Sequence, residues 1–218
     1  MSALDCIYEI MENEVQRRDS NALARRLKEA KICLPNARPD TIDFSIERGL
    51  DKNKIDALLT MRWMEEHQNI IITGAAGCGK TFLACALVNQ ACIKGRTARV
   101  VRVPLLLNQM AASHQIVETY FKKLKEMKTI DLLVLDDWGI GQLDARSRQD
   151  LLEIINERYM YASTIVTSVL PVNKWSEYIN DTTYSDAILD RLVSVSHRVE
   201  LNGASVRQMK EYGAVLKE

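Results

Sequence analysis

The sequence predicts an α/β fold in which helices cover a mainly parallel sheet of five strands. Strand and helix patterns alternate from residue 69 to residue 201. Predicted strands such as 70–72 and 132–135 are apolar at every position, as expected for parallel strands that are covered on both faces. A glycine-rich segment also stands between the first strand and the helix after it, an arrangement found in parallel α/β units.

Residues 1–50 predict a helical arm followed by a linker. Apolar residues recur at helical spacing from Leu4 to Val15, and the pattern resumes at Leu23. The Asp-Ser-Asn run at 19–21 interrupts it, so we expect two helices or one kinked helix. Two prolines then end helical propagation, because proline lacks the N–H donor and restricts the residue before it. The segment up to residue 50 is therefore predicted to be a linker.

Residues 51–218 predict the catalytic core. Helices are expected at 52–67, 80–93, 145–160 and 184–193, helical turns at 104–127, and strands at 69–73, 97–103, 130–136, 163–167 and 197–201. Residues 202–218 are too few for a separate helical lid, so we expect a core without a full C-terminal lid.

Composition excludes several classes of protein. The 218 residues carry 29 basic and 29 acidic side chains, so the formal net charge is +0 and the chain lacks the field of a general nucleic-acid binder. Five cysteines without a C-x-x-C pair argue against a disulfide framework or a zinc site. The acidic first fifteen residues do not resemble a secretory signal, and no apolar run is long enough to span a membrane. We therefore expect a cytoplasmic protein with no membrane partner.

A phosphate-binding loop follows the first predicted strand. The pattern G-x-x-x-x-G-K-[ST] is matched by Gly74, Ala75, Ala76, Gly77, Cys78, Gly79, Lys80 and Thr81, and Phe82 continues into the helix. Backbone N–H groups of such a loop and the helix N-terminus cradle phosphates. Lys80 is expected to bridge the β- and γ-phosphates and Thr81 to bind Mg²⁺. The alternative, a glycine-rich turn without a ligand, does not account for the position between strand and helix.

Two adjacent carboxylates end the third predicted strand. Asp136 and Asp137 follow an apolar run, at the strand end where ligands of open α/β sheets bind. We expect Asp136 to hold Mg²⁺ through water and Asp137 to orient or deprotonate the attacking water. The alternative is a strand that ends in a solvated acidic turn.

The order of these motifs resembles the IstB/DnaC-like family of AAA+ ATPases, and most closely the IstB-type helpers of insertion sequences. The resemblance covers about residues 4–207. It rests on Gly-Lys-Thr-Phe-Leu-Ala-Cys-Ala-Leu from Gly79, Val-Leu-Asp-Asp-Trp-Gly from Val134, Ser-Thr-Ile-Val-Thr-Ser from Ser163 and Asp-Ala-Ile-Leu-Asp-Arg-Leu-Val from Asp186. It implies ATP and Mg²⁺ as cofactors, and a homo-oligomer whose ATP sites are completed between subunits.

The resemblance also implies roles for single residues. Arg191 matches the arginine that reaches the γ-phosphate on a neighbouring subunit, and Arg207 matches a second-sensor arginine. An Asp190–Arg191 pair on an exposed helix is the alternative to the first of these roles. Val169 replaces the usual polar first sensor, so that role falls on Thr167 or Ser168 or is weakened. The arm also begins later than in typical members, which implies that an initial helical segment is absent.

Two basic clusters are candidate surfaces for DNA or a protein partner. The first lies in the arm and the second precedes the third strand: Arg17, Arg18, Arg25, Arg26, Lys28 and Lys31, then Lys122, Lys123, Lys125 and Lys128. Such clusters neutralise phosphates without reading bases. The alternative in both cases is a solvated helix face.

Three functions remain open from the sequence. The first is a transposition helper that assembles on duplex DNA without sequence preference, engages its cognate transposase and hydrolyses ATP. The second is a replicative helicase loader, and the third is a small-molecule P-loop kinase. Against the kinase stand the Leu-Asp-Arg motif and the lack of an arginine-rich lid after the third strand. Because Asp137 is shorter than the glutamate common in AAA+ enzymes, slow turnover is compatible with each ATPase.

Overall fold

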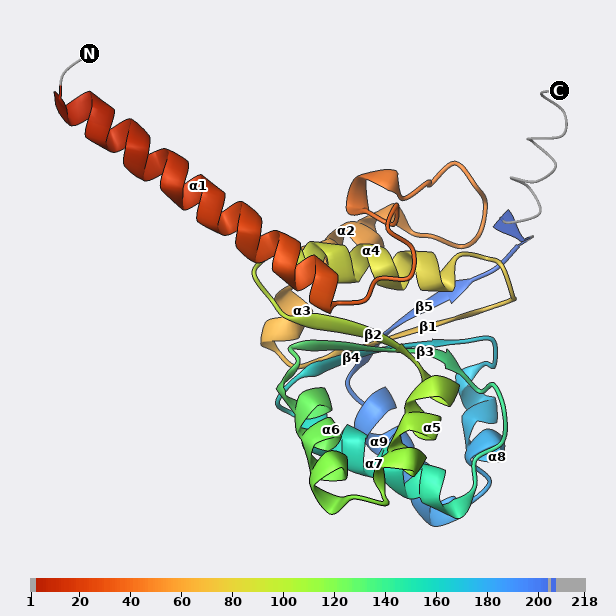
Figure 1. Cartoon of the computed structure of the whole chain (residues 1–218). Coiled ribbons are helices and arrows are strands. Elements are labelled where there is room, and N and C mark those ends of the chain that lie inside the picture. Colours follow the sequence, from red (N-terminus) through yellow and green to blue (C-terminus); the bar gives the residue numbers. More distant parts are fainter. Residues whose placement is uncertain (1–2, 204, 207–218) are drawn as a thin grey trace, which may run out of the picture.

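The structure, a computed structural model, describes residues 3–203, 205 and 206 and contains one parallel sheet. Its strands lie in the order β2-β3-β4-β1-β5, and every pair of neighbours is parallel. Their bounds are β1 (Asn69–Gly74), β2 (Ala98–Arg102), β3 (Leu132–Trp138), β4 (Ser163–Ser168) and β5 (Ser196–Leu201). The predicted α/β fold is confirmed (Figure 1).

Helices pack on both faces of this sheet. They are α1 (Ala3–Glu29), α2 (Lys52–Leu59), α3 (Arg62–Glu65), α4 (Lys80–Ile93), α5 (Val103–Ser113), α6 (Val117–Thr129), α7 (Ala145–Arg158), α8 (Trp175–Ile179) and α9 (Thr182–Val193), with 3₁₀ turns η1 (Pro39–Thr41) and η2 (Val172–Lys174). Figure 1 shows α2 and α4 on one face and the helices from α5 to α9 on the other. Within the described residues, none of these helices combines the length and apolar composition needed to cross a bilayer.

Alternate residues of each strand enter two separate hydrophobic cores. Ile70 and Ile72 pack with α4 on one face, whereas Ile71 packs with α5 and α7 on the other. Leu132 and Leu133 divide in the same way. Successive side chains of a strand point to opposite faces, so a strand covered on both sides has to be apolar at every position. This explains the uninterrupted apolar runs from which the strands were predicted.

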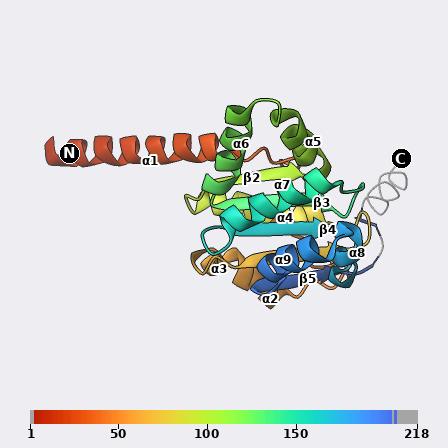
Figure 2. The ribbon, with the colours of Figure 1, turned by 90° about the horizontal axis from the view of Figure 1, so that it is seen from below.

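The N-terminal arm is a single helix, and the break expected at residues 19–21 is wrong. Helix α1 runs without interruption from Ala3 to Glu29 and projects from the body of the molecule (Figures 1 and 2). Asp, Ser and Asn each cost only about 0.5 kcal/mol relative to alanine inside a helix, and no Gly or Pro lies there. The helix ends instead near Lys31, whose φ of 51° is left-handed.

The helix predicted at 52–67 is two helices. Helix α2 ends at Leu59, and Met61 adopts a left-handed backbone with φ 65° before α3 begins. The carbonyl of Leu58 accepts a hydrogen bond of 3.1 Å from the N–H of Met61 and one of 2.9 Å from the indole N–H of Trp63. Met61 and Trp63 are both buried, so packing against the core outweighs the local cost of the left-handed residue.

The linker packs directly on the core. Ala30, Ala37 and Ile42 are buried in the hydrophobic core on the α4 face. The carbonyl of Ala30 also accepts a hydrogen bond of 2.9 Å from the N–H of Val100 at the β2 edge. The division of the chain at residue 50 stays a prediction, but these contacts bring the linker next to the start of α4.

Candidate nucleotide-binding site

The glycine-rich loop lies at the carboxyl end of the sheet, between β1 and the N-terminus of α4. Gly79 caps α4 with a left-handed φ of 99°. Gly74 has φ 148°, and a β-carbon there would overlap the carbonyl oxygen of Leu201 at the end of β5. Gly79 is therefore required for its left-handed backbone, and Gly74 because there is no room for a β-carbon. The two glycines thus place the loop directly before the α4 N-terminus, the position at which backbone N–H groups can bind phosphate.

Lys80 is held within this loop. It is 9% exposed, and its Nζ donates hydrogen bonds to the carbonyls of Gly74 at 2.9 Å and Ala75 at 2.8 Å. These neutral acceptors fold the ammonium group back over the loop. A phosphate oxygen is a stronger partner for an ammonium group than a carbonyl, because the hydrogen bond then joins two opposite charges.

A group of hydroxyls surrounds Asp136 at the end of β3. The Thr81 hydroxyl donates to Asp136 Oδ1 at 3.0 Å. The Thr167 hydroxyl, from β4, donates to the same oxygen and accepts a hydrogen bond of 3.3 Å from the N–H of Asp137. This geometry follows from the strand order, because β4 lies between β1 and β3. Asp136 is 5% exposed, so its carboxylate is fixed.

Asp137 has a different environment from Asp136. Its backbone is left-handed with φ 62°, and the β3–β4 register is irregular between Leu135 and Trp138. The carboxylate points outward and accepts a hydrogen bond of 2.7 Å from Nε of Arg102, at the end of β2. This hydrogen bond raises the pKa of Arg102. Two neighbouring carboxylates are therefore separated into a buried one bound to hydroxyls and an accessible one bound to a surface cation.

A cavity of ≈ 380 Å³ opens beside the loop. It is lined by residues of the loop and α4, of the linker, and of the strand ends: Gly77, Gly79, Lys80, Thr81, Phe82, Leu34, Thr41, Asp43, Ile46, Arg48, Asp137 and Val169 among them. Its size matches the range of small-molecule sites, about 300–1,000 Å³. The lining combines polar groups such as Lys80 and Thr81 with apolar side chains such as Phe82 and Ile46, as a ligand with a charged triphosphate and a flat base requires.

The residues at this edge also fit a magnesium ion. Mg²⁺ prefers hard oxygen ligands and is held by one or two carboxylates together with phosphate oxygens and water. The hydroxyl of Thr81 and the carboxylate of Asp136 supply such oxygens, and they already lie within hydrogen-bond distance of each other. The chemistry of this donor set agrees with the sequence prediction for both residues.

The two candidate first sensors have different positions. Thr167 contacts both Asp136 and Asp137. The Ser168 hydroxyl instead donates to the Trp138 carbonyl at 2.7 Å and accepts from the N–H of Leu170. Ser168 therefore holds the backbone after β4, and of the two only Thr167 bonds to the Asp136 carboxylate and to the Asp137 backbone.

Arg191 lies at the opposite end of the sheet from the loop. The carbonyl of Arg191 accepts a hydrogen bond of 3.1 Å from Asn69, the first residue of β1, whereas the loop follows the last residue of that strand. Its guanidinium donates to the Ala187 carbonyl at 2.7 Å and lies 5.8 Å from the centre of the Tyr159 ring. Arg207, the second candidate arginine, lies outside the described residues.

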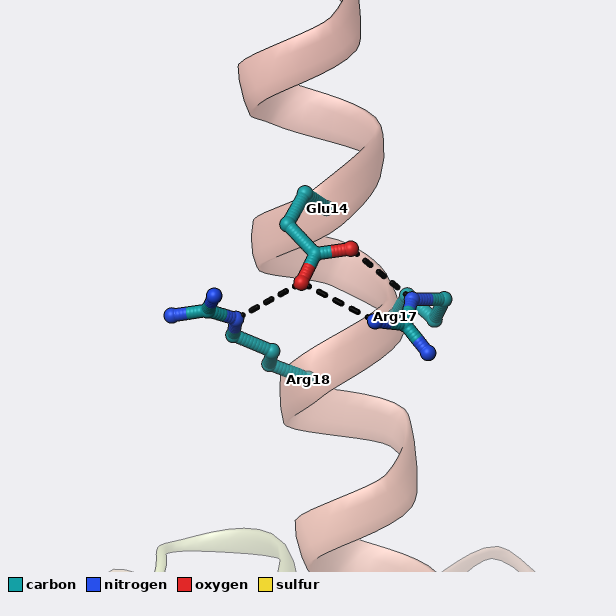
Figure 3. Close-up of polar contacts among 3 residues, drawn as sticks. All are labelled: Glu14, Arg17 and Arg18. Atoms are coloured by element: carbon teal, nitrogen blue, oxygen red, sulfur yellow. Dashed lines mark hydrogen bonds and ion pairs between the residues drawn. The ribbon is translucent and has the colours of Figure 1, made fainter.

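The first basic cluster does not form one continuous face. Arg17 and Arg18 both donate to Glu14, with Nε–oxygen distances of 2.8 Å (Figure 3). Arg26 is half-buried, and its Nε has no hydrogen-bond partner among the described residues. At about 100° per residue, Arg26 points away from Arg17 on α1. The exposed part of the cluster therefore excludes Arg26 and includes an acidic partner that the sequence pattern did not indicate.

In the second cluster, Lys122 and Lys125 are exposed on α6. Lys123 Nζ is 3.5 Å from Oε1 of Gln109, and Lys128 forms an ion pair with Glu157. Lys128 is exposed too but is neutralised by Glu157, so among the described residues the unpaired exposed charge of this helix lies on Lys122 and Lys125.

Sequence reasoning missed two arginines at the site. Arg102 stands at the end of a predicted strand, so the rule that ligands bind at carboxyl strand ends was a usable signal for it. Arg48 lies in the linker before Gly49, and nothing in its spacing connects it to a loop thirty residues later. Its Nη1 nevertheless donates to the Cys78 carbonyl at 3.3 Å.

Comparison with known proteins identifies the family to which this chain belongs. Residues 1–214 match the family model described as "IstB-like ATP binding protein". An insertion sequence ATP-binding protein of Sinorhizobium fredii, y4pL, is 42% identical over 199 residues, which cover 91% of this chain and 80% of that protein. A protein of the same description from the insertion sequence IS1162 of Pseudomonas fluorescens is 38% identical over 162 residues, which cover 74% of this chain and 70% of that protein.

Solved structures with the same fold come from replication proteins. The DnaC helicase loader superposes with a TM-score of 0.64 at 19% identity, covering 77% of this chain and 98% of that chain. AMPPCP-bound DnaA from Aquifex aeolicus gives a TM-score of 0.64 at 20% identity and covers 84% of this chain and 56% of that chain. At these identities the likeness establishes the shared AAA+ fold.

Proposed function

We propose that this chain, which belongs to the IstB-like ATP-binding proteins, is the ATP-hydrolysing helper of a DNA transposition system. Membership of that family and the AAA+ fold make it an ATPase. The observation that carries the proposal is the convergence of Lys80, Thr81 and Asp136 at one edge of the sheet in a chain whose relatives are named as insertion sequence proteins.

The first step is nucleotide binding. Lys80 exchanges its two carbonyl acceptors for oxygens of the β- and γ-phosphates, and the loop N–H groups bind the remaining phosphate oxygens. Thr81 and Asp136 hold Mg²⁺, which neutralises charge on the phosphates when it is bound.

Hydrolysis then depends on Asp137. Its carboxylate is accessible and lies beyond the buried Asp136, where it can orient or deprotonate a water molecule for attack on the γ-phosphate. Thr167 bonds to both aspartates and keeps their relative position. Since Asp137 is shorter than glutamate and is paired with Arg102, turnover of the isolated subunit is expected to be slow.

Arg191 acts on the site of a neighbouring subunit. Its backbone lies at the start of β1, six residues or about 20 Å of strand from the loop of its own chain. A cation that stabilises the transferred phosphoryl group has to touch it, so the assigned role requires an oligomer. Mixing Arg191→Ala subunits with Lys80→Ala subunits tests this directly. We expect each variant alone to lack hydrolysis and the mixture to regain part of it, whereas no recovery would contradict action between subunits.

Duplex DNA without sequence preference is the proposed ligand of the assembly. Exposed cations on α1 and on α6, including Lys122 and Lys125, provide phosphate contacts without base readout. We expect duplexes of unrelated sequence to stimulate ATP hydrolysis, and this stimulation to fall with increasing salt. The double substitution Lys122→Gln/Lys125→Gln should weaken stimulation. A matched control, Lys52→Gln/Lys54→Gln, removes two exposed charges from α2 on the other face of the sheet.

The partner of the DNA-bound form is the transposase encoded with it. The proposal predicts that purified cognate transposase is retained by the ATP-bound protein on DNA and released after hydrolysis. Hydrolysis and assembly that are both indifferent to DNA would contradict the transposition role while leaving the ATPase intact.

A replicative helicase loader is the second candidate, because the fold matches the DnaC helicase loader over most of its length. The protein that binds to this chain distinguishes the two functions. Capture of a replicative helicase, without capture of transposase, would favour the loader.

A further inference from the structure

Arg48 joins three segments that meet beside the nucleotide site. Its guanidinium donates from Nη2 to the Asp43 carbonyl in the linker at 3.0 Å and from Nη1 to the Cys78 carbonyl in the phosphate-binding loop at 3.3 Å. Its own carbonyl accepts a hydrogen bond of 2.8 Å from the N–H of Asn202, just after β5. Arg48 thus connects the linker, the loop and the end of the last strand.

The charge of Arg48 is buried. The residue is 5% exposed, and burial lowers the pKa of its guanidinium, with the nearby Asp43 carboxylate acting in the opposite direction. Both hydrogen bonds described above go to neutral carbonyl oxygens. Nε is buried as well and has no hydrogen-bond partner within residues 3–203, 205 and 206. Burying a cation with incomplete hydrogen bonding is costly, and an approaching anion reduces that cost.

The position of this cation relative to the loop indicates which anion it meets. Arg48 lines the same cavity as Lys80, Thr81 and Phe82. Its Nη1 lies 2.5 Å from the place where a β-carbon on Gly79 would stand, so the guanidinium rests on the loop backbone where α4 begins. Lys80 covers the other end of the loop, at Gly74 and Ala75. The two cations are therefore at different ends of one phosphate-binding loop.

We propose that Arg48 is a nucleotide-binding residue that contacts the α-phosphate end of the bound adenine nucleotide, away from the γ-phosphate. The inference rests on the nucleotide-binding part of the proposed function. Both ATP and ADP carry an α-phosphate, so Arg48 is expected to strengthen the binding of both nucleotides to a similar extent. Because the same side chain holds Asp43 in the linker, nucleotide binding also stabilises the linker against the loop.

The test compares Arg48→Met with a matched control, Arg38→Met. Arg38 lies in the same linker, but it is exposed and paired with Asp40. Titration of each protein with fluorescent ATP and ADP in the presence of Mg²⁺ gives the two Kd values. For Arg48→Met we expect the Kd values for ATP and ADP to rise by about 10- to 100-fold, because a charge-assisted hydrogen bond to phosphate is lost. We expect Arg38→Met to bind both nucleotides with the Kd values of the wild type.

A purely structural role for Arg48 gives a different pattern. In that case the nucleotide-free melting temperature falls, while the Kd values of the folded variant are unchanged, and this result would overturn the inference. If Arg48→Met does not fold, Arg48→Lys is the second variant. It keeps the positive charge but lacks the planar guanidinium with its fixed N–H donors, so we expect both Kd values to rise by a smaller factor. Hydrogen exchange of residues 43–49 in the wild-type chain is an independent readout. Exchange should slow on addition of ADP, and unchanged exchange would also overturn the inference.

The wild type and Lys80→Ala are included in the same titrations. Failure of the wild type to bind nucleotide would refute the proposed function itself. Binding by the wild type, loss of binding in Lys80→Ala, and wild-type Kd values in Arg48→Met would refute only the role of Arg48.

Discussion

The two ends of the sheet satisfy their polar groups in opposite ways. At the amino end, Arg158 is buried and donates hydrogen bonds to five oxygens: the carbonyls of Met127, Ile130, Asp131 and Ser163 and the hydroxyl of Thr164. Burial lowers the pKa of Arg158 to about 9, so it remains charged near neutral pH. Asn69 adds hydrogen bonds to the N–H of Thr164 and to the carbonyl of Arg191. The buried guanidinium at this end is therefore bonded entirely to groups of the protein itself, beside a small cavity of ≈ 100 Å³.

At the carboxyl end, the same kinds of groups are held by exchangeable partners. Lys80 bonds to two loop carbonyls, Asp137 to a surface arginine, and Arg48 leaves one buried N–H without a partner in the described part of the chain. Each of these bonds has a stronger substitute in a bound nucleotide or its metal ion. The comparison indicates that the amino end provides stability and the carboxyl end provides ligand binding, which predicts different consequences for substitutions at the two ends.

The largest effect is expected from Lys80→Ala at the carboxyl end. Loss of two charge-assisted contacts to phosphate should weaken binding of Mg·ATP by about 100-fold or more and remove detectable hydrolysis, with little change in the nucleotide-free melting temperature. Isothermal titration calorimetry measures the binding of Mg·ATP, and the release of phosphate measures hydrolysis. Lys94→Ala, an exposed lysine at the other end of α4, is the control. Wild-type binding by the Lys80 variant would contradict the assigned site.

Arg158→Met at the amino end should act on stability and leave nucleotide affinity unchanged in the folded protein. The substitution leaves several buried oxygens without donors, so we expect a loss of about 3 kcal/mol or more in the free energy of unfolding. Urea denaturation measures this loss, and Arg146→Met, at the exposed first turn of the same helix, is the control. An equally stable Arg158→Met protein would remove the distinction between the two ends.

Asp137→Asn should separate binding from hydrolysis. We expect the affinity for ATP to be retained and the turnover to fall by about 100-fold or more, because the amide cannot accept a proton from the attacking water. The ATP-bound assembly should then persist, which size-exclusion chromatography with ATP can detect. Asp137→Glu keeps the carboxylate and is expected to retain turnover. If the asparagine variant turned over at the wild-type rate, another group would have to position the water.

The smallest effect is expected from Arg102→Ala. Arg102 is mostly exposed, and an exposed ion pair contributes about 1 kcal/mol or less. Releasing Asp137 from this pair should raise the kcat of the isolated protein by about two- to fivefold. Arg99→Ala, on the same strand as Arg102, breaks an ion pair with Glu126 of α6 and should leave kcat unchanged. A fall in kcat on loss of Arg102 would indicate instead that this arginine takes part in hydrolysis.

Most of the candidate nucleotide site could be predicted from the sequence, because its residues are consecutive. The loop from Gly74 to Thr81 and the Asp136–Asp137 pair each occupy one short segment whose local pattern is tied to one geometry. The uninterrupted apolar runs likewise predicted buried parallel strands. Patterns failed where local preference and packing disagree, as at residues 19–21 in α1 and at Met61, whose left-handed backbone follows from burial of its side chain.

The sequence by itself determined the fold class, the phosphate-binding loop and the pair of carboxylates, since backbone conformation and apolar periodicity are properties of neighbouring residues. Only the tertiary structure decided that β4 lies between β1 and β3 and brings Thr167 to Asp136. It also placed Arg48 on the loop and Arg191 at the far end of the sheet. These relations join residues tens of positions apart, so they depend on strand order and on packing between segments, which no local pattern encodes.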